Sequence, residues 1–335
     1  MKTKWGFFGC ILLIFVLIFF NLTLGKVNIP LEDIYKVLTF NSTNEVYQNL
    51  ILNYRLPKIM TTILVGLALP IAGFLLQELF KNPLAEPSVL GITAMSGLGV
   101  AIVVFLFSLL GLDYFLTNSW VMIFAAIIGA FVALLVISGF SYRTKTVTSL
   151  IILGMMLSGL AIAIIGVLQY FAPSEKLKIY LIWSFGTLSA LSWQQIFVFG
   201  IFVLTGVLLA FSTLPSLTFL MLGEKYAQSL GVNLKKLRWI ILISTAILTA
   251  SVTAFAGPIS FIGLAVPHIC RTLLRTTNMY LLFVWVMLFG VSLMLIFSIL
   301  TDVFPFGTLP INIITSLFGT PIVMSILLKK SKVVL

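Results

Sequence analysis

Long apolar runs, separated by short clusters of charged residues, constrain the fold of this chain more than any other feature. Each run is close to the 20 or so residues that a helix needs to cross the hydrocarbon core of a bilayer. Backbone N–H and C=O groups in lipid must form their hydrogen bonds within their own segment, as they do in a helix. The runs therefore predict an all-α polytopic membrane protein with about ten transmembrane helices. The predicted spans are residues 5–24, 57–80, 91–111, 118–140, 147–171, 195–215, 239–257, 259–276, 280–300 and 309–328.

The composition excludes a water-soluble body of this size. Of the 335 residues, 61% are hydrophobic and only 9% are charged, whereas a soluble domain carries about 25% charged residues. A single helical bundle in lipid can use the whole chain. Residues 1–335 are therefore expected to form one transmembrane domain.

The basic residues predict the orientation. If the N-terminus is cytoplasmic, 14 of the 20 Lys and Arg residues fall in inner segments and 6 in outer segments. The positive-inside rule favours this arrangement, with both termini in the cytoplasm and an even number of spans. The net charge of +11 then reflects membrane orientation, and nucleic-acid binding is not expected.

Several kinds of chemistry lack the residues they need. Cys10 and Cys270 are far apart in sequence and His268 is the only histidine, so no metal site is predicted. No Walker A pattern is present, so the chain does not hydrolyse ATP itself. Glu78 and Glu86 are expected near the cytoplasmic face, which leaves no carboxylate at mid-membrane for ion coupling. No cofactor is predicted.

An intramembrane hydrolase is the alternative from another functional class. Ser96 and His268 would have to meet as nucleophile and base within hydrogen-bond reach. Our spans place them on separate helices near the inner face. Small residues such as Ser96 and Gly97 are better explained by close helix packing. We therefore expect a protein that is not an enzyme.

One inner segment carries an amphipathic pattern. Leu222, Tyr226 and Leu230 recur at i, i+4 and i+8, and Gly231 follows as a C-cap, so residues 222–232 are predicted to form a short helix with an apolar stripe. The stripe could rest on the membrane interface or in a groove of a partner protein. The residues alone leave both possibilities open.

Motifs along almost the whole chain resemble those of the FecCD-like permeases, which import siderophores, haem and cobalamin in ABC transporters. The most specific of them is the run from Ala256 to Arg271. The others are Arg55-Leu56-Pro57-Lys58, Gly66 through Gly73 with Gln77, Asn82-Pro83-Leu84-Ala85-Glu86-Pro87, Trp183-Ser184-Phe185-Gly186, Leu222-Gly223-Glu224 through Gly231, and Leu309-Pro310-Ile311 with Gly319-Thr320-Pro321.

The resemblance implies a type II ABC importer permease fold in the cytoplasmic (inner) membrane of a bacterium. It implies a second permease subunit, identical or paralogous, with the transport pathway between the two. Two ATPase subunits would bind inside and an extracytoplasmic substrate-binding protein outside. The cargo is expected to be an iron–siderophore-type chelate, with cobalamin or haem as the alternative.

The resemblance also implies roles for particular residues. Arg55 and Lys58 would dock the binding protein, and we expect both side chains to face water. Residues 222–232 would form the coupling helix, seated in a groove of the ATPase. The ATPase-coupling residues would be Leu222, Gly223, Glu224, Tyr226, Ala227, Leu230, Gly231, His268 and Arg271. The cytoplasmic gate would include Thr146, Val147, Thr148 and Ser149.

Two departures from the family pattern fall near the outer face. The segment from Asp302 to Leu309 lacks the usual Arg and has Thr308 in the place of a Glu. Asn312 stands where the family usually has a glycine after the Leu-Pro pair. One basic docking contact is therefore expected to be missing.

Overall fold

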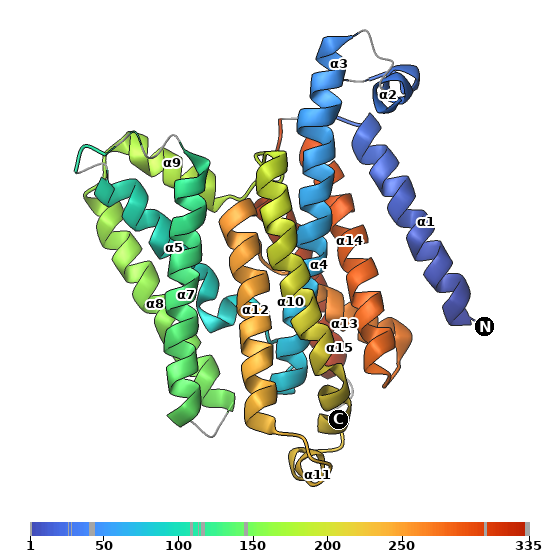
Figure 1. Ribbon diagram of the computed structural model, residues 1–335, viewed down its shortest axis with the longest axis vertical. Helices are drawn as coiled ribbons and strands as arrows, with labels where there is room; N and C mark the ends of the chain where they lie inside the picture. The colour runs from blue at the N-terminus through green and yellow to red at the C-terminus, as the bar shows by residue number, and fades with distance from the viewer. Residues whose placement is uncertain are drawn as a thin grey trace.

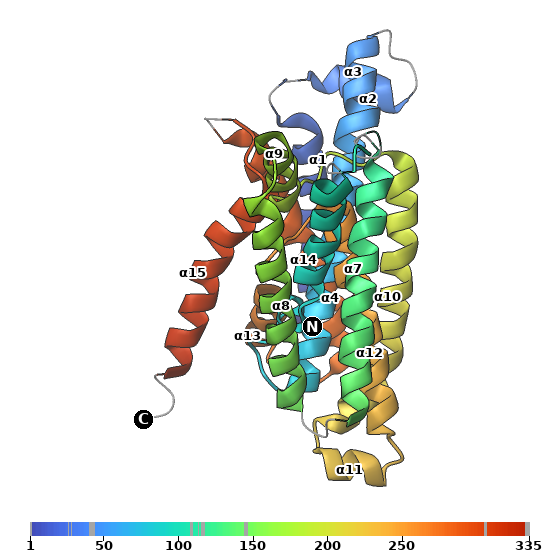
Figure 2. The same cartoon turned by 90° about the vertical axis from the view of Figure 1, so that its left-hand side faces the viewer.

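The computed structural model describes residues 2–25, 27, 29–39, 44–107, 110–112, 114, 118–143, 147–304 and 307–331. Within these ranges the chain is built from helices and their connections, with no strand. Figures 1 and 2 show a bundle of long helices that run roughly side by side. The predicted all-α class is confirmed.

Each of the ten predicted spans corresponds to a helical segment. Seven of the described helices are long and apolar enough to cross a membrane, judged by length and composition, and the segment at 92–106 and α13 are shorter apolar helices. The ten segments are α1 (Lys2–Thr23), α4 (Leu56–Phe80), α5 (Ile92–Ala101) continued by the π-helical turn η3 (Ile102–Leu106), α7 (Ser119–Arg143), α8 (Val147–Tyr170), α10 (Trp193–Leu220), α12 (Leu234–Ala256), α13 (Ile262–Leu274), α14 (Met279–Val303) and α15 (Ile311–Ser331).

Short elements mark the two ends of the bundle. Figure 1 shows α2 (Leu31–Leu38), α3 (Glu45–Leu50) and α9 (Ser174–Ser184) at one end and α11 (Glu224–Ser229) at the other. Following the predicted orientation, these are called the outer end and the inner end. The N-terminal end of α1 and the C-terminal end of α15 both point toward the inner end (Figure 1).

Two proline positions shift the boundaries from those predicted. The second span was expected to begin at Pro57, but α3 runs into α4 through the π-helical turn η1 (Ile51–Arg55). In that turn the Leu56 N–H bonds to the Ile51 carbonyl, five residues back, which is the π-type pattern. Similarly, α10 continues through Pro215 to Leu220, so the inner connection spans 221–233 and not 216–238.

Helix α4 lies at the centre of the bundle, where glycines let neighbouring backbones touch. A Cβ atom at Gly73 would lie 1.7 Å from the Gly263 carbonyl oxygen of α13, and one at Gly66 would lie 2.8 Å from the Val291 Cα atom of α14. Small residues at such crossings allow the close approach on which membrane helices depend. These contacts fix α13 and α14 against α4.

The small residues on α5 have the packing role that the sequence predicts. A Cβ atom at Gly99 would lie 2.1 Å from the Ala125 carbonyl oxygen of α7, and one at Gly129 would lie 2.0 Å from the Met95 carbonyl oxygen. Ser96 is fully buried beside this crossing. Close packing of α5 on α7 therefore accounts for this stretch.

Candidate functional site

Lys58 lies inside the outer half of the bundle, on the first turn of α4. Its ammonium group donates to Asp302 Oδ2 at 2.6 Å, to Thr301 Oγ1 at 3.1 Å and to the Ser298 carbonyl at 3.1 Å. Three acceptors match the three protons of the ammonium group. Lys58 is only 7% exposed, so it joins α4 to α14 from within.

Arg55 is likewise turned into the protein. Its guanidinium donates to the backbone carbonyls of Leu22 and Val27, at and just beyond the C-terminal end of α1. Arg55 is 8% exposed. The expectation that Arg55 and Lys58 face water is therefore wrong, because unpaired carbonyls at the end of α1 and a carboxylate on α14 attract them inward. Contact with a binding protein stays a prediction, and it would require them to leave these partners.

A recess of about 360 Å³ opens beside Lys58 at the outer end. It lies between the connection that follows α9 and the segment that precedes α15. Its lining residues are Lys58, Ile182, Phe185, Gly186, Thr187, Leu188, Ser189, Thr301, Asp302, Thr308, Leu309, Pro310 and Ile311. Thr308, which replaces the family's usual Glu, is thus part of this wall, whereas residues 305 and 306 lie outside the described chain.

Helix α9 is held at the outer end by aromatic packing. Tyr180 lies with its ring centroid 5.4 Å from that of Phe105 and 5.9 Å from that of Trp183. Burial raises the pKa of Tyr180 to about 12. On α2, by contrast, Glu32 is exposed, and its 2.6 Å hydrogen bond from Lys36 lowers the pKa of that carboxyl.

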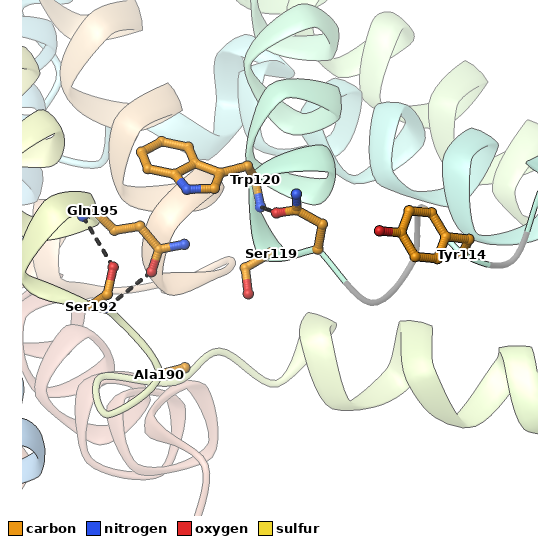
Figure 3. Close-up of a pocket in the computed structure, with 7 residues that line it drawn as sticks. Tyr114, Ser119, Trp120, Ala190, Ser192 and Gln195 are labelled. Carbon is orange, nitrogen blue, oxygen red and sulfur yellow. Dashed lines mark hydrogen bonds between the residues drawn. The ribbon is translucent and has the colours of Figure 1, made fainter.

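A second outer recess, of about 550 Å³, lies where α7 and α10 begin (Figure 3). Its lining residues are Tyr114, Asn118, Ser119, Trp120, Ala190, Ser192 and Gln195. Asn118 Oδ1 accepts the Trp120 N–H at 3.0 Å, and Ser192 and Gln195 form a capping box. Several of its polar groups thus cap helices, and none of the lining residues is charged.

Arg271 is the centre of a polar cluster at the inner end. It donates to Glu78 Oε1 at 2.8 Å and to Gln77 Oε1 at 3.1 Å, and its guanidinium lies 5.8 Å from the Phe74 ring centroid. Gln77 in turn donates to the Gly263 and Leu264 carbonyls. The cluster therefore joins α13 to α4 through side-chain hydrogen bonds near the inner end. These add to the backbone contact between Gly73 and Gly263.

His268 lines an inner recess of about 440 Å³ together with Arg271. The remaining lining residues are Gln77, Glu78, Lys81, Asn82, Pro83, Leu217, Leu220 and Met221. His268 and Arg271 thus share one wall, beside the C-terminal end of α10, and their coupling role stays a prediction. Ser96 Oγ, by contrast, is buried without any hydrogen-bond partner. The structure therefore does not pair it with His268 as a nucleophile and base.

Helix α11 is shorter than the predicted 222–232 helix. It spans Glu224–Ser229, because Gly223 breaks the helix with a φ of 111°. Gly231 has a φ of 85° and donates to the Gln228 carbonyl, so the predicted glycine C-cap is confirmed. Arg238 on α12 lies 3.3 Å from Glu224 and ties the element to the bundle.

The predicted stripe on this element is exposed. Leu222, Tyr226 and Leu230 are 63%, 55% and 47% exposed, whereas Ala227 is fully buried. The element thus contacts its own chain through Ala227 and turns three large apolar side chains outward.

The predicted gate lies at the edge of the described chain. Thr146 is outside the described residues, and Val147 and Thr148 begin α8 without described side chains. Ser149 is partly buried. The gate stays a prediction.

Helices α8 and α15 each present an exposed, uncharged surface. On α8, Met155, Met156 and Leu160 are 61%, 68% and 57% exposed. On α15, Asn312, Ser316 and Thr320 follow one another at i, i+4 and i+8, and they line a recess of about 570 Å³ with Phe185, Ile313, Leu317 and Pro321. Figure 2 shows α15 diverging from the bundle toward its C-terminal end.

Glu86 has a hydrogen-bond partner that the sequence does not predict. Its carboxylate Oε1 accepts the Phe261 N–H at 2.6 Å, at the N-terminal end of α13. This contact joins Glu86 to the end of α13 opposite Arg271. The paired prolines Pro83 and Pro87 were the only signal that this segment turns back into the bundle.

No group of three or more His, Cys, Asp or Glu side chains that could hold a metal ion occurs among the described residues. Cys10 and Cys270 are free thiols and both are buried. The polar clusters described above are thus built from ion pairs and backbone hydrogen bonds.

The fold described above agrees with the known proteins that this chain resembles. A family profile described as the FecCD transport family matches residues 12–329. A solved structure described as an ABC transporter of metal-chelate type in an inward-facing conformation superposes with a TM-score of 0.84 at 30% identity, and the match covers 96% of this chain and 98% of that chain.

Curated relatives match most of the chain, but they are named for different transported substrates. The molybdate import system permease protein MolB of Haemophilus influenzae is 32% identical, over 94% of this chain and 93% of that protein. The hemin transport system permease protein HmuU of Yersinia pestis is 31% identical, over 92% of each. The vitamin B12 import system permease protein BtuC of Vibrio parahaemolyticus is 32% identical, over 87% and 86%. The chain belongs to the FecCD transport family and is a multi-pass membrane permease of the ABC-importer type.

Proposed function

We propose that this permease imports an iron–siderophore-type chelate, driven by ATP hydrolysis on partner subunits. The observation that carries this proposal is the absence of charge from the exposed surfaces of α8 and α15. No charged residue occurs in residues 147–171 or 311–328. On the proposed assembly, two copies or two related permeases would enclose the pathway between such faces.

An uncharged wall favours a cargo whose charge is already shielded. A bare ion in a water-poor passage loses hydration that such a wall cannot replace. A chelate surrounds its metal with organic ligand and presents an outer surface that apolar side chains tolerate. The amide and hydroxyl groups of Asn312, Ser316 and Thr320 would offer a few hydrogen bonds without binding the cargo tightly.

Haem or cobalamin is the alternative cargo, since both are also bulky chelates and relatives carry those names. The molybdate relative marks a small oxyanion as a third candidate. It is less suited to this face, because an oxyanion is bound best by cationic or clustered N–H donors.

The exposed stripe of α11 supports a role as the coupling helix. Three apolar side chains that would otherwise face water favour burial in a groove of a partner protein. We assign that groove to the ATPase. Leu222, Tyr226 and Leu230 would enter it, with Gly223, Glu224, Ala227 and Gly231 setting the shape of the element. His268 and Arg271 would lie beside the contact.

At the outer end we propose that a substrate-binding protein docks and delivers the cargo. The recess beside Lys58 adjoins the start of α15 and therefore the proposed pathway. At the other end of the pathway, the segment 146–149 would form the cytoplasmic gate.

The decisive experiment is uptake by the reconstituted transporter. The permease would be assembled in proteoliposomes with the ATPase and binding protein encoded beside it. We expect ATP-dependent accumulation of a radiolabelled ferric siderophore. A hundredfold excess of haemin, cobalamin or molybdate should not compete.

Competition by one of these three compounds, together with its own ATP-dependent uptake, would reassign the cargo. A matched control is a Walker-lysine variant of the ATPase, which should abolish uptake while the permease remains inserted.

A further inference from the structure

Glu86 has a structural partner that the proposed function does not use. The carboxylate belongs to the segment between α4 and the 3₁₀ turn η2 (Pro87–Leu90), and it accepts the Phe261 N–H at 2.6 Å. Phe261 is the N-cap residue of α13 and has no side-chain group of its own that could cap the helix. The cap of α13 is thus supplied from another part of the chain.

The beginning of α13 favours such a partner. The first N–H groups of a helix lack intrahelical acceptors, and the helix dipole places partial positive charge there. Ile262 and Gly263 on the first turn are buried. The ring of Pro87, next to Glu86, lies 3.1 Å from the position of a Cβ atom at Gly263. The Glu86 carboxylate is therefore held where its negative charge stabilises the beginning of α13.

Phe261 needs external support for its conformation. It has a φ of 69°, in the left-handed region. That region is unfavourable for residues with a Cβ atom and persists only where surrounding contacts impose it. The Glu86 hydrogen bond to the Phe261 N–H is one such contact.

The Phe261 side chain in turn packs directly against the backbone of α15. A Cβ atom at Gly319 would lie 2.5 Å from Phe261 Cβ and 3.1 Å from Phe261 Cγ. The backbone of α15 thus rests directly on this side chain, and only glycine fits there.

Among the described side chains, the other attachments of α15 lie at or before this point. Phe318 stacks on Phe297 of α14 with ring centroids 6.0 Å apart, and the Asn312 N–H bonds to the Phe185 carbonyl. Beyond Gly319, the described side chains of Thr320, Pro321 and Met324 are exposed. Gly319 is therefore the last described attachment of α15, and Figure 2 shows the helix diverging from the bundle toward its C-terminal end.

We propose that Glu86 is a positioning residue for α15. By capping α13 it holds Phe261 in the left-handed conformation, and Phe261 sets where α15, one wall of the proposed pathway, leaves the bundle. Its importance for transport rests on the proposed function, whereas its effect on α15 does not.

The test measures the mobility of α15 directly. A nitroxide label is attached to Leu317→Cys in a chain whose Cys10 and Cys270 are replaced by serine, and a separate sample carries it at Met156→Cys on α8. In Glu86→Ala, the ratio of mobile to immobile signal at position 317 should rise about fivefold, the effect of losing one cap interaction. Gly319→Ala should mobilise the same label by steric displacement. Glu86→Gln retains an acceptor oxygen and should remain close to the parent chain.

Two controls separate positioning from general loosening. The label at position 156 should be unchanged in every variant. Asn118→Ala removes a comparable cap from α7, where Asn118 Oδ1 accepts the Trp120 N–H, and should leave the label at position 317 unchanged. The proposal is overturned if Glu86→Ala leaves position 317 as immobile as in the parent chain, or if both labels mobilise together.

Transport provides the second readout. In proteoliposomes, Glu86→Ala should reduce uptake several-fold more than it reduces ATP hydrolysis, and Glu86→Gln should restore the ratio. Equal loss of both activities in Glu86→Ala would contradict a role in positioning the pathway. If the parent chain transports none of the four cargoes, the proposed function fails while the mobility result still decides the role of Glu86.

Discussion

At the scale of single residues, several charged side chains of this protein join helices. Lys58 is paired with Asp302 across α4 and α14, Arg55 covers the carbonyl end of α1, and Arg271 binds Glu78 across α13 and α4. In a bundle with 9% charged residues, such contacts define the register of the helices. The role of such a charged side chain therefore has to be interpreted first from the group that it binds within the protein.

The Lys58–Asp302 pair should show the asymmetry of a buried ion pair. Asp302→Ala leaves an ammonium group that is 7% exposed without its counter-ion. We expect a loss of about 2 kcal/mol, below the figure for a fully buried pair because the Asp302 side chain is 28% exposed. The double variant Lys58→Met with Asp302→Ala should lose less than Asp302→Ala alone. Thermal unfolding in detergent measures both, and a double variant less stable than Asp302→Ala would contradict the pairing.

Gly73 should tolerate no side chain. Gly73→Ala places a Cβ atom 1.7 Å from the Gly263 carbonyl oxygen, so α4 and α13 must separate, at a cost of about 1–3 kcal/mol or more. Gly200→Ala on α10 is the matched control, since nothing lies within 4 Å of the added Cβ. Comparable yield and melting temperature for the two variants would show that the crossing is looser than described.

At the scale of elements, α11 combines a defined shape with an unpartnered surface. Its end is fixed by Gly231, whose φ of 85° suits glycine, and its stripe remains outside the fold of its own chain. The element can therefore be altered without disturbing the membrane-spanning helices.

Gly231→Val should impair coupling through backbone conformation alone. No atom lies within 4 Å of a Cβ at Gly231, so the substitution costs about 1 kcal/mol by forcing a branched residue into the left-handed region. We expect transport-stimulated ATP hydrolysis to fall while insertion of the permease is unchanged. Gly231→Asn is the control, because Asn accepts this conformation more readily. Full stimulation in Gly231→Val would remove α11 from the coupling role.

At the scale of the whole molecule, the two ends of the bundle differ. The outer end carries α2, α3 and α9 with two recesses, and the inner end carries α11 and the Arg271 cluster (Figure 1). If the positive-inside rule applies, the inner end faces the cytoplasm.

Cysteine labelling tests this orientation. A membrane-impermeant maleimide should label Tyr226→Cys only from the cytoplasmic side and Lys178→Cys only from the outside, and both positions are exposed. The native thiols of Cys10 and Cys270 are buried and give a low background. Labelling of Tyr226→Cys from the outside would invert the topology.

The sequence by itself determined where the ten helical segments lie and that Gly231 terminates the α11 element. Both depend on local properties, namely the hydropathy of about 20 consecutive residues and the conformational freedom of one glycine. Two of the boundaries that moved lie where proline was accommodated, at Pro57 and Pro215, and α12 begins at Leu234, five residues earlier than predicted.

Only the tertiary structure decided what the charged residues do. Lys58 and Asp302 are 244 positions apart, and Glu86 is 175 positions from Phe261. The sequence predicted that Arg55 and Lys58 face water at the start of the second span, whereas both side chains are buried. The local sequence determines how far along a helix a residue lies. The direction and the partner of its side chain depend on which helices pack together. In a protein interior of low dielectric, the nearest unsatisfied carbonyl or carboxylate then determines where each charge points.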